Sequence, residues 1–238
     1  MRIGIIKYPG SNCDEDTFRY FSTDENGENN DVFFIWHKET NMPSAMDLLI
    51  IPGGFAFGDR YYTKGATGEY DMDPGKMAVK SAVTKIIMQT YREKIPILGI
   101  CNGFQILTET GLLPGALKRN DNLHFISKHH HLKIVNNDNS FLQDLEVGEI
   151  VNIPVAHHDG NYFIEKEELK DLQDNGQVLL QYCNEQGENQ VLNGSVDQIA
   201  GVCNKEKNVF GLMPHPERAM EILLGCDDGV KMLQGLLK

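Results

Sequence analysis

The residues best suited to covalent chemistry lie in the short stretch Gly99-Ile100-Cys101-Asn102-Gly103. This stretch follows an apolar run and opens a helix-like segment, which is the pattern of a nucleophile elbow with cysteine in place of serine. A turn from strand to helix within one residue forces Cys101 into a strained conformation, and glycines at 99 and 103 remove side chains that would collide. A thiol at a helix N-terminus ionises more readily, and the thiolate is the nucleophile. The alternative interpretation is a buried cysteine between two turn glycines.

A histidine and a glutamate two residues apart could supply the base. His215 and Glu217 alternate with prolines in Met213-Pro214-His215-Pro216-Glu217, after another apolar run. Prolines keep the chain extended, and residues two apart in an extended chain lie on one side, about 6.6 Å apart along the axis. The carboxylate can then fix the imidazole tautomer and leave the other ring nitrogen free to take a thiol proton. A surface His/Glu pair is the alternative for this motif by itself.

Backbone N–H groups could hold the oxyanion of such a reaction. The Asn102 N–H lies at the expected helix N-terminus, and Gly53 and Gly54 end a third apolar run. Glycine lets the backbone approach a substrate closely, and both turns are expected at the carboxyl edge of the sheet, where open α/β folds bind ligands. A plain strand-end turn explains the double glycine equally well.

The elements that must position these residues follow from short apolar runs that alternate with amphipathic stretches. Strands are expected at Arg2–Tyr8, Val32–Trp36, Leu48–Ile51 and Ile95–Ile100, and helices at Cys13–Phe21, Lys76–Tyr91 and Gly103–Thr110. From about Leu123 the character changes to strand-like segments with little helix between them, followed by a last helical stretch. These segments are Leu132–Val135, Ile150–Val155, Val178–Tyr182, Ile199–Cys203 and Val209–Met213, and the helical stretch is Ala219–Leu237.

The fold class predicted from this order is α/β, with a doubly wound, mostly parallel sheet, helices on both faces and a smaller antiparallel extension. The chain has no internal repeat and no linker rich in proline or serine, so residues 1–238 are expected to form a single domain. The polar stretches Thr23–Asp31 and Tyr61–Asp73 are expected to be surface loops.

Composition narrows the classes of partner and compartment. Lys+Arg number 22 and Asp+Glu 34, for a net charge of −12. Such a chain lacks the positive field that nucleic acids or anionic membranes attract, so neither is expected as a partner. The five cysteines are an odd number without a C-x-x-C pair, which argues against a disulfide framework or a thiolate zinc site. No apolar run approaches the ~20 residues that span a bilayer, and a cytoplasmic location is expected.

Together these motifs resemble the class I, triad-type glutamine amidotransferases, through G-x-C-x-G-x-Q at Gly99–Gln105 and the late His-Pro-Glu. Within that group, four stretches are similar to the glutaminase subunits of an amidine-forming synthase of purine biosynthesis. They are Tyr8–Asp14, Pro52–Asp59, Gly99–Leu107 and Gly211–Ala219, spread from one end of the chain to the other. The resemblance implies a flavodoxin-like fold and hydrolysis of glutamine to glutamate and ammonia.

By position, the resemblance assigns the nucleophile, the general base and acid, and the orienting carboxylate to Cys101, His215 and Glu217. It assigns the oxyanion hole to the backbone N–H groups of Gly53 or Gly54 and of Asn102, and Gln105 and His157 are weaker candidates for substrate binding. His157-His158-Asp159-Gly160 stands where the family commonly has His-Gly-Glu-Gly, so His157 matches and the next positions do not. His157 could also face the ammonia path or the partner.

The resemblance further implies partners. The ammonia would pass to a separate ATP-dependent synthase subunit, which converts formylglycinamide ribonucleotide to the amidine, and a small third subunit usually bridges the two. No metal and no cofactor are expected in this chain, while ATP and Mg²⁺ are expected on the synthase. The chain has no phosphate-binding G-x-x-x-x-G-K-[ST] motif, because Gly75-Lys76 has Tyr70 at the first glycine position and Met77 at the hydroxyl position.

Three further features of the sequence are not explained by these motifs. Arg60–Pro74 is longer than the family's usual loop, so contacts made by that loop are not carried over. In a strand, His129 and His131 of the run His129–His131 face one side, which leaves too few ligands for a metal and favours a solvated strand edge. Cys13 lies in a family-like turn with no base identifiable beside it, and is expected to be structural or interfacial.

Three other functions stay open on the sequence. A cysteine hydrolase or protease of related fold would share the elbow but cleave other amides. Another amidotransferase would feed a different synthase. A non-catalytic interaction subunit would keep the fold without forming a thioester.

Overall fold

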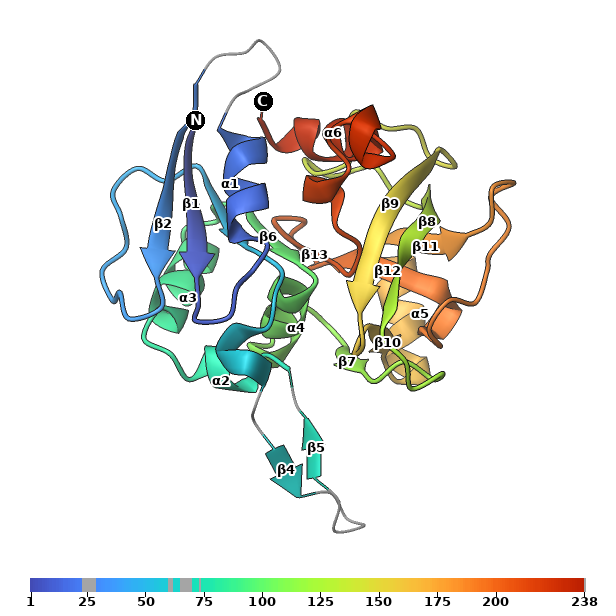
Figure 1. The fold of residues 1–238 in the computed structure, drawn as a ribbon, viewed down its shortest axis with the longest axis horizontal. Coiled ribbons are helices and arrows are strands. Elements are labelled where there is room, and N and C mark those ends of the chain that lie inside the picture. The colour runs from blue at the N-terminus through green and yellow to red at the C-terminus, as the bar shows by residue number, and fades with distance from the viewer. Residues whose placement is uncertain (23–28, 60–61, 65–69, 73, 238) are drawn as a thin grey trace.

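A sheet of nine strands runs through the molecule (Figure 1). The structure, a computed structural model, describes residues 1–22, 29–59, 62–64, 70–72 and 74–237. The strands lie in the order β2-β1-β3-β6-β13-β12-β11-β8-β9, parallel from β2 to β13 and antiparallel from β13 to β9. The predicted fold class, a parallel sheet with an antiparallel extension, is confirmed, and the extension belongs to the same sheet, with as many antiparallel as parallel pairings.

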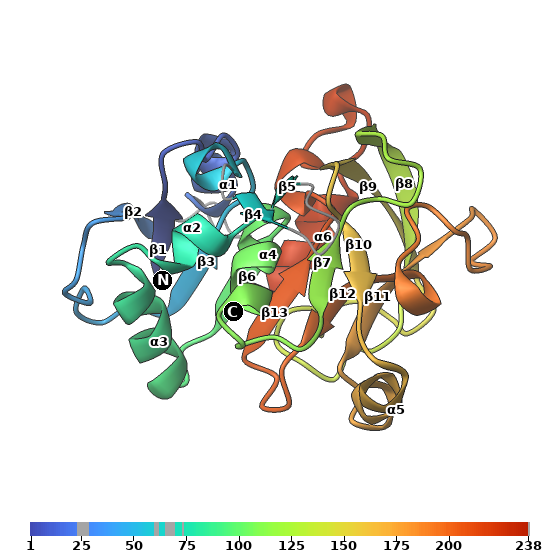
Figure 2. The same ribbon diagram turned by 90° about the horizontal axis from the view of Figure 1, so that it is seen from below.

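The parallel strands lead into the turns that carry the predicted functional motifs. It consists of β1 (Arg2–Lys7), β2 (Asp31–Trp36), β3 (Leu48–Ile51), β6 (Ile97–Ile100) and β13 (Val209–Leu212). Every residue of β3, β6 and β13 is buried, which explains their continuous apolar sequences. Right-handed connections run from β1 to β2 in one direction and from β3 to β6 in the other. Helices α1 (Asp14–Phe21) and α3 (Thr84–Arg92) therefore cover opposite faces (Figure 2).

The antiparallel part extends the sheet with β12 (Ile199–Cys203), β11 (Val178–Cys183), β8 (Ile126–Ile134) and β9 (Ile150–His157). Strand β9 lies at one edge of the sheet and ends at His157. The Pro154 carbonyl of β9 accepts from the His215 N–H at 2.8 Å, so the end of β9 lies beside the loop that follows β13. Helix α6 (Asp228–Gln234) lies on the same face as α1, where the Tyr20 hydroxyl donates to the Val230 carbonyl over 3.0 Å (Figure 1).

The predicted helix Lys76–Tyr91 is wrong as one element. The chain forms α2 (Lys76–Val79) and then α3, with a break between them. The Ser81 hydroxyl donates to the Ala78 carbonyl at 2.6 Å, and the Thr84 hydroxyl donates to the Val79 carbonyl at 2.8 Å. These side chains occupy carbonyls that a continuous helix would use, which explains the break.

The C-terminal stretch also differs from its prediction. Residues 219–237 form η4 (Ile222–Leu224), α6 and η5 (Gly235–Leu237) rather than one helical stretch, and Gly225 ends η4 with φ of 108°. The structure adds α5 (Lys166–Asp174), a polar helix that buries only Leu172 and therefore lacks a clear apolar stripe in the sequence. It also adds the short pair β7 (Ala116–Lys118) and β10 (Asn161–Phe163).

Two stretches expected to be loops are only partly described. Within Tyr61–Asp73 the chain forms an antiparallel pair, β4 (Tyr62–Lys64) and β5 (Tyr70–Met72), which projects from the rest of the molecule (Figure 1). The remainder of Arg60–Pro74, except Pro74, and most of Thr23–Asp31 lie outside the described residues, and Asp31 begins β2. Among the helices that the structure describes, none has both the length and the apolar character needed to cross a bilayer.

Candidate active site

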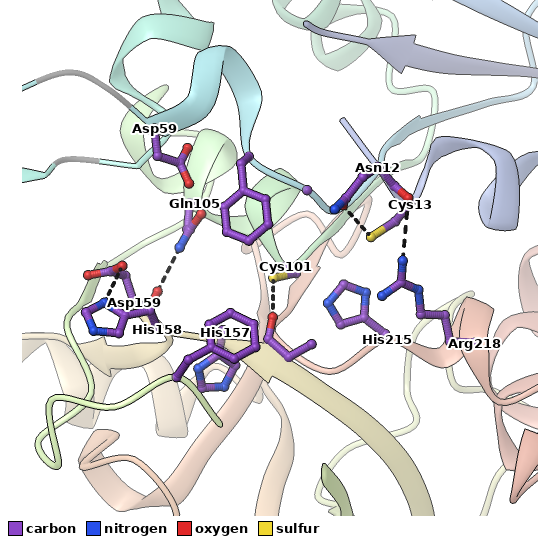
Figure 3. Close-up of a pocket in the computed structure, with 14 residues that line it drawn as sticks. Asn12, Cys13, Asp59, Cys101, Gln105, His157, His158, Asp159, His215 and Arg218 are labelled. Carbon is purple, nitrogen blue, oxygen red and sulfur yellow. Dashed lines mark hydrogen bonds and ion pairs between the residues drawn. The ribbon is translucent and has the colours of Figure 1, made fainter. Parts of the chain in front are cut away.

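The turns that follow β1, β3, β6 and β13 meet at the carboxyl edge of the parallel strands, where open α/β sheets bind their ligands. They form one pocket together with residues from the end of β9 (Figure 3). Its lining comprises Asn12, Cys13, Gly54, Phe55, Asp59, Cys101, Gln105, Phe125, Ala156, His157, His158, Asp159, His215 and Arg218. The pocket thus collects residues from both halves of the sheet.

The elbow has the strained geometry expected of it. Cys101 stands between β6 and α4 (Asn102–Glu109) with φ of 51° and ψ of −102°, outside the common regions for a side-chain-bearing residue. A Cβ at Gly103 would lie 1.9 Å from the Ile51 carbonyl oxygen, and one at Gly99 would lie 2.7 Å from the Gly103 backbone. The two glycines let the helix start directly against the sheet, so the predicted reason for both is confirmed.

His215 and Glu217 form a hydrogen-bonded pair. The Nδ1–H of His215 donates to the Glu217 carboxylate at 2.7 Å, and both side chains are buried. The His215 backbone N–H donates to the Pro154 carbonyl at 2.8 Å, which fastens this loop to β9. Nε2 of His215 has no hydrogen-bond partner within the described part of the chain. The ring is therefore held by one nitrogen and presents the other to the pocket.

The surroundings of His215 favour its charged form. Burial alone lowers the pKa of this imidazole, but the Glu217 carboxylate and the Cys101 thiol raise it well above its ordinary value. A thiol that gives its proton to such an imidazole forms a thiolate–imidazolium pair, the reactive state of cysteine hydrolases. The pocket can therefore perform nucleophilic chemistry on a carbonyl.

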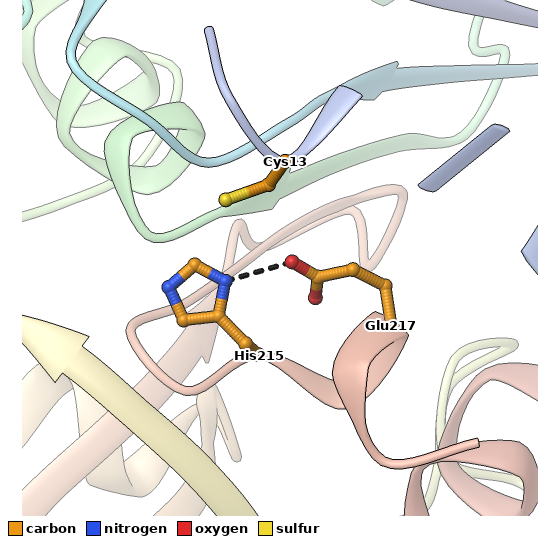
Figure 4. Close-up of side chains that lie close together, drawn as sticks. All are labelled: Cys13, His215 and Glu217. Carbon is orange, nitrogen blue, oxygen red and sulfur yellow. Dashed lines mark hydrogen bonds and ion pairs between the residues drawn. The ribbon is translucent and has the colours of Figure 1, made fainter. Parts of the chain in front are cut away.

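A second thiol, that of Cys13, also lies beside His215 (Figure 4). Ligand atoms of Cys13, His215 and Glu217 all lie within 4.8 Å of one another, so these donors could also hold a transition metal. The expectation that no base lies beside Cys13 is wrong, because the fold brings His215 to it from near the other end of the chain. Burial raises the pKa of Cys13, although the neighbouring imidazole of His215 acts in the opposite direction.

The turn after β3 packs tightly against the base. A Cβ at Gly53 would lie 2.7 Å from Cε1 of His215 and 3.1 Å from Sγ of Cys13, so a side chain has no room there. The Asn102 side chain ties this turn to the elbow, because its Oδ1 accepts from the Ala56 N–H at 3.0 Å. Gly54 lines the pocket. The proximity of Gly53, Gly54 and Asn102 to the elbow suits the oxyanion role predicted for them.

Gln105 is a fixed part of the pocket wall. Its Oε1 accepts from Nδ2 of Asn102 at 2.8 Å, and its Nε2 donates to the Asp159 carbonyl at 2.7 Å. Both ends of the amide are therefore engaged within the protein. The predicted contact of Gln105 with substrate remains a prediction.

His157 lines the pocket and keeps one ring nitrogen without a hydrogen-bond partner among the described residues. Asn120 donates its amide N–H groups to the carbonyls of His124 and His157, so its oxygen is the acceptor for Nδ1–H of His157 at 3.1 Å. Nε2 of His157 then carries no proton and, within the described residues, no partner. Burial, followed by the charge on His215, lowers the pKa of His157 to about 3, which keeps the ring neutral.

The pocket contains two carboxylates that the sequence reasoning did not single out, Asp59 and Asp159. Burial first, and then the charge on Asp159, raise the pKa of Asp59 to about 7. Both residues lie inside stretches already compared with the family, but nothing local in the sequence indicates that they face one pocket. Arg218 also lines the pocket, and its Nε–H donates to the Asp16 carboxylate at 3.0 Å.

The histidine run lies elsewhere. His130 is buried and His129 exposed, so the predicted alternation is confirmed, but β8 lies between β11 and β9 and is not a strand edge. Burial lowers the pKa of His130 to about 4, and its ring packs 5.7 Å from that of Tyr182.

Comparison with known proteins decides the family. The model of the CobB/CobQ-like glutamine amidotransferase domain matches residues 1–224. The chain belongs to this family. The chain is 54% identical to the phosphoribosylformylglycinamidine synthase subunit PurQ of Sulfurimonas denitrificans over 238 residues, covering 100% of both chains. It is 45% identical to the subunit of that name from Aquifex aeolicus, covering 100% of this chain and 99% of the relative.

Solved structures agree with this membership. The structure of PurLQS from Thermotoga maritima contains a chain that matches with a TM-score of 0.83 and 37% identity, covering 99% of this chain and 97% of that one. The glutaminase domain of Trypanosoma brucei CTPS matches with a TM-score of 0.62 at 13% identity, which shows the shared fold. The protein is a glutamine amidotransferase with the fold class expected from its sequence.

Proposed function

We propose that this chain is the glutaminase subunit of phosphoribosylformylglycinamidine synthase. It hydrolyses glutamine and supplies ammonia to an ATP-dependent subunit, which converts formylglycinamide ribonucleotide to formylglycinamidine ribonucleotide. The chemical part rests on one observation, the buried His215–Glu217 pair beside a cysteine in a strained elbow. The physiological part is supported by end-to-end similarity to relatives that carry this subunit's name.

The chemistry follows from the geometry. His215 takes the proton of the Cys101 thiol, and the thiolate attacks the side-chain amide carbon of glutamine. Backbone N–H groups of Gly53 or Gly54 and of Asn102 stabilise the oxyanion. His215 then gives its proton to the amide nitrogen, the C–N bond breaks, and ammonia leaves a glutamyl thioester.

Hydrolysis of the thioester restores the site. His215 takes a proton from water, the hydroxide adds to the thioester carbon, and the C–S bond breaks to release glutamate. The sulfur regains its proton from His215, so atoms and charge balance over the cycle. Glu217 stabilises the imidazolium in both halves, which is the role of the third group in a triad.

The partners in this proposal are the ATP-dependent synthase subunit, PurL, and the small bridging subunit, PurS. The chain itself needs no cofactor, and ATP and Mg²⁺ act on the synthase in a cytoplasmic complex. An exposed apolar segment supports docking, because Ile222, Leu223 and Leu224 are 77%, 94% and 59% exposed. Three consecutive aliphatic side chains in water are typical of a surface that a partner covers.

The test uses the reconstituted complex with the Cys101→Ala variant. Glutamine-dependent amidine formation should be lost, and ammonia-dependent formation should persist because the synthase is untouched. Acid quench of the unaltered complex should trap a glutamyl thioester. Normal use of glutamine by the variant would contradict the proposal, and copurification with a different synthase would assign the chain to another pathway.

A further inference from the structure

The pocket beside Cys101 has an acidic end. Asp59 and Asp159 both line it, and each is 8% exposed. Asp159 contacts His158 at 3.2 Å and Arg119 at 3.7 Å. For Asp59, the contact found within the described residues is a long one, 3.4 Å from Nδ2 of Asn102. No cation of the described residues pairs with Asp59.

A buried carboxylate without a cation is costly, and a second carboxylate nearby increases the cost. Asp59 meets both conditions, since burial and the charge on Asp159 both oppose its ionisation. A cation bound between the two carboxylates would offset both the cost of burying Asp59 and its repulsion from Asp159. The electrostatics of this end of the pocket therefore suit a positively charged ligand group.

The position of the acidic end relative to Cys101 indicates which part of a ligand it could bind. Asp59 and Asp159 lie on one side of Cys101, and His215, Cys13 and Arg218 lie on the other (Figure 3). Gln105 lies between the two carboxylates and holds the Asp159 backbone. A ligand that places an amide carbon on Cys101 can therefore extend a short chain toward Asp59.

An independent observation indicates that the pocket receives a ligand with N–H groups. His157 is 3% exposed and lines the same pocket, and its acceptor Nε2 has no partner within the described residues. This nitrogen is separate from the acidic pair and has no hydrogen-bond donor in the described part of the protein.

We propose that Asp59, supported by Asp159, binds the α-ammonium group of glutamine and makes the site selective for an α-amino acid amide. This inference rests on the proposed glutaminase function and adds a specificity residue to it. Because Arg119 and His158 already contact Asp159, Asp59 carries the larger share of the recognition.

The test compares glutamine with glutaramate, the same amide without the α-amino group, in the reconstituted complex. Asp59→Asn keeps the shape of the side chain and removes its charge. KM for glutamine should therefore rise about 10- to 100-fold, because a hydrogen bond to a charged group typically strengthens binding by that factor. The kcat for glutamine should change much less, and KM for glutaramate should stay nearly constant. Asp59→Glu should recover part of the preference for glutamine.

Asp174→Asn, which alters an exposed carboxylate at the end of α5, is the matched control and should behave like the unaltered protein. A second readout avoids turnover, namely the glutamine concentration that protects Cys101 from a glutamine-like diazo ketone. It should rise in Asp59→Asn by the same factor as KM. Circular dichroism and the retained use of glutaramate show whether the variant is folded.

The outcomes separate the inference from the function on which it rests. If the unaltered complex does not hydrolyse glutamine, the proposed function fails. If it does, but Asp59→Asn keeps the KM and the protecting concentration of glutamine, the inference is wrong. Equal weakening of glutamine and glutaramate also overturns it, because the carboxylate would then act on something other than the α-ammonium group.

Discussion

Two cysteines stand at the same kind of place in this fold and differ in backbone conformation. Cys13 precedes α1 at the end of the turn after β1, and Cys101 precedes α4 directly after β6. Both are buried, line one pocket and interact with His215. Cys13 has φ of −110° and ψ of 6°, an unstrained conformation, whereas Cys101 has φ of 51° and ψ of −102°.

This difference separates two thiols that both lie at a helix N-terminus beside the same imidazole. The strained turn puts Cys101 between β6 and α4 without any linker, and its thiol points toward the Ala156 carbonyl across the pocket at 3.8 Å. The Cys13 thiol instead donates to the neighbouring Asn12 side chain at 3.4 Å. Under the proposed function the covalent step belongs to Cys101, and we expect Cys13 to pack against the imidazole.

The strongest test of this comparison replaces each thiol in turn. Cys101→Ala should lower glutaminase kcat by at least about 10³-fold, because the covalent route is lost. Cys13→Ala should lower it less than about tenfold, since by this assignment only packing against the base changes. Glutamate release measured on both variants decides the matter. The reverse order would make Cys13 the nucleophile.

A second test removes the charge behind the shared base. Glu217→Gln should reduce kcat by about 10²- to 10⁴-fold, because the imidazolium loses its stabilising carboxylate. The Glu217 charge raises the pKa of His215, so any pH-dependent step that needs neutral His215 should shift to lower pH in the variant. The pH profile of kcat/KM checks this, and an unchanged profile would show that Glu217 does not act through His215.

A third test addresses the strain at the elbow. Gly103→Ala would place a Cβ 1.9 Å from the Ile51 carbonyl oxygen and should destabilise the protein by about 3 kcal/mol, an overpacking cost. Gly111→Ala is the control, because nothing lies within 4 Å of its added Cβ and only its φ of 73° opposes the change, at about 1 kcal/mol. Urea unfolding compares them, and equal costs would mean that close packing at the elbow is unimportant.

The smallest expected effect concerns His157 in the pocket wall. The pKa of His157 is lowered to about 3 in the folded chain, so only the unfolded chain takes up this proton between pH 6.5 and 3. Stability is therefore complete above pH 6.5 and falls with acid, by up to about 1.4 kcal/mol per pH unit.

His157→Gln should flatten this dependence, measured as unfolding free energy at pH 6.5 and 5. Gln190→Asn, on an exposed side chain that does not titrate, should leave the slope unchanged. A slope that is the same in all three proteins would show that His157 is protonated in the folded state.

Much of the site could be predicted because its chemistry is local in sequence. The elbow needs five consecutive residues and the base with its orienter needs three, so strand, turn and helix signals place them without long-range information. The parallel strands are equally visible, because sheets covered on both faces require continuous apolar runs. The hidden elements are polar or short. Helix α5 buries one residue, and the break before α3 depends on hydroxyl contacts with carbonyls.

The sequence by itself therefore determined the fold class, the strained cysteine and the His215–Glu217 pair, since each depends on neighbours along the chain. Only the tertiary structure decided that Cys13 lies beside the same imidazole, that Asp59 and Asp159 line one pocket, and that His157 lines it with an unpartnered nitrogen. Each of these arrangements involves residues from the ends of different strands. Their distances and burial depend on how the sheet brings strand ends together, and no local pattern of residues encodes that.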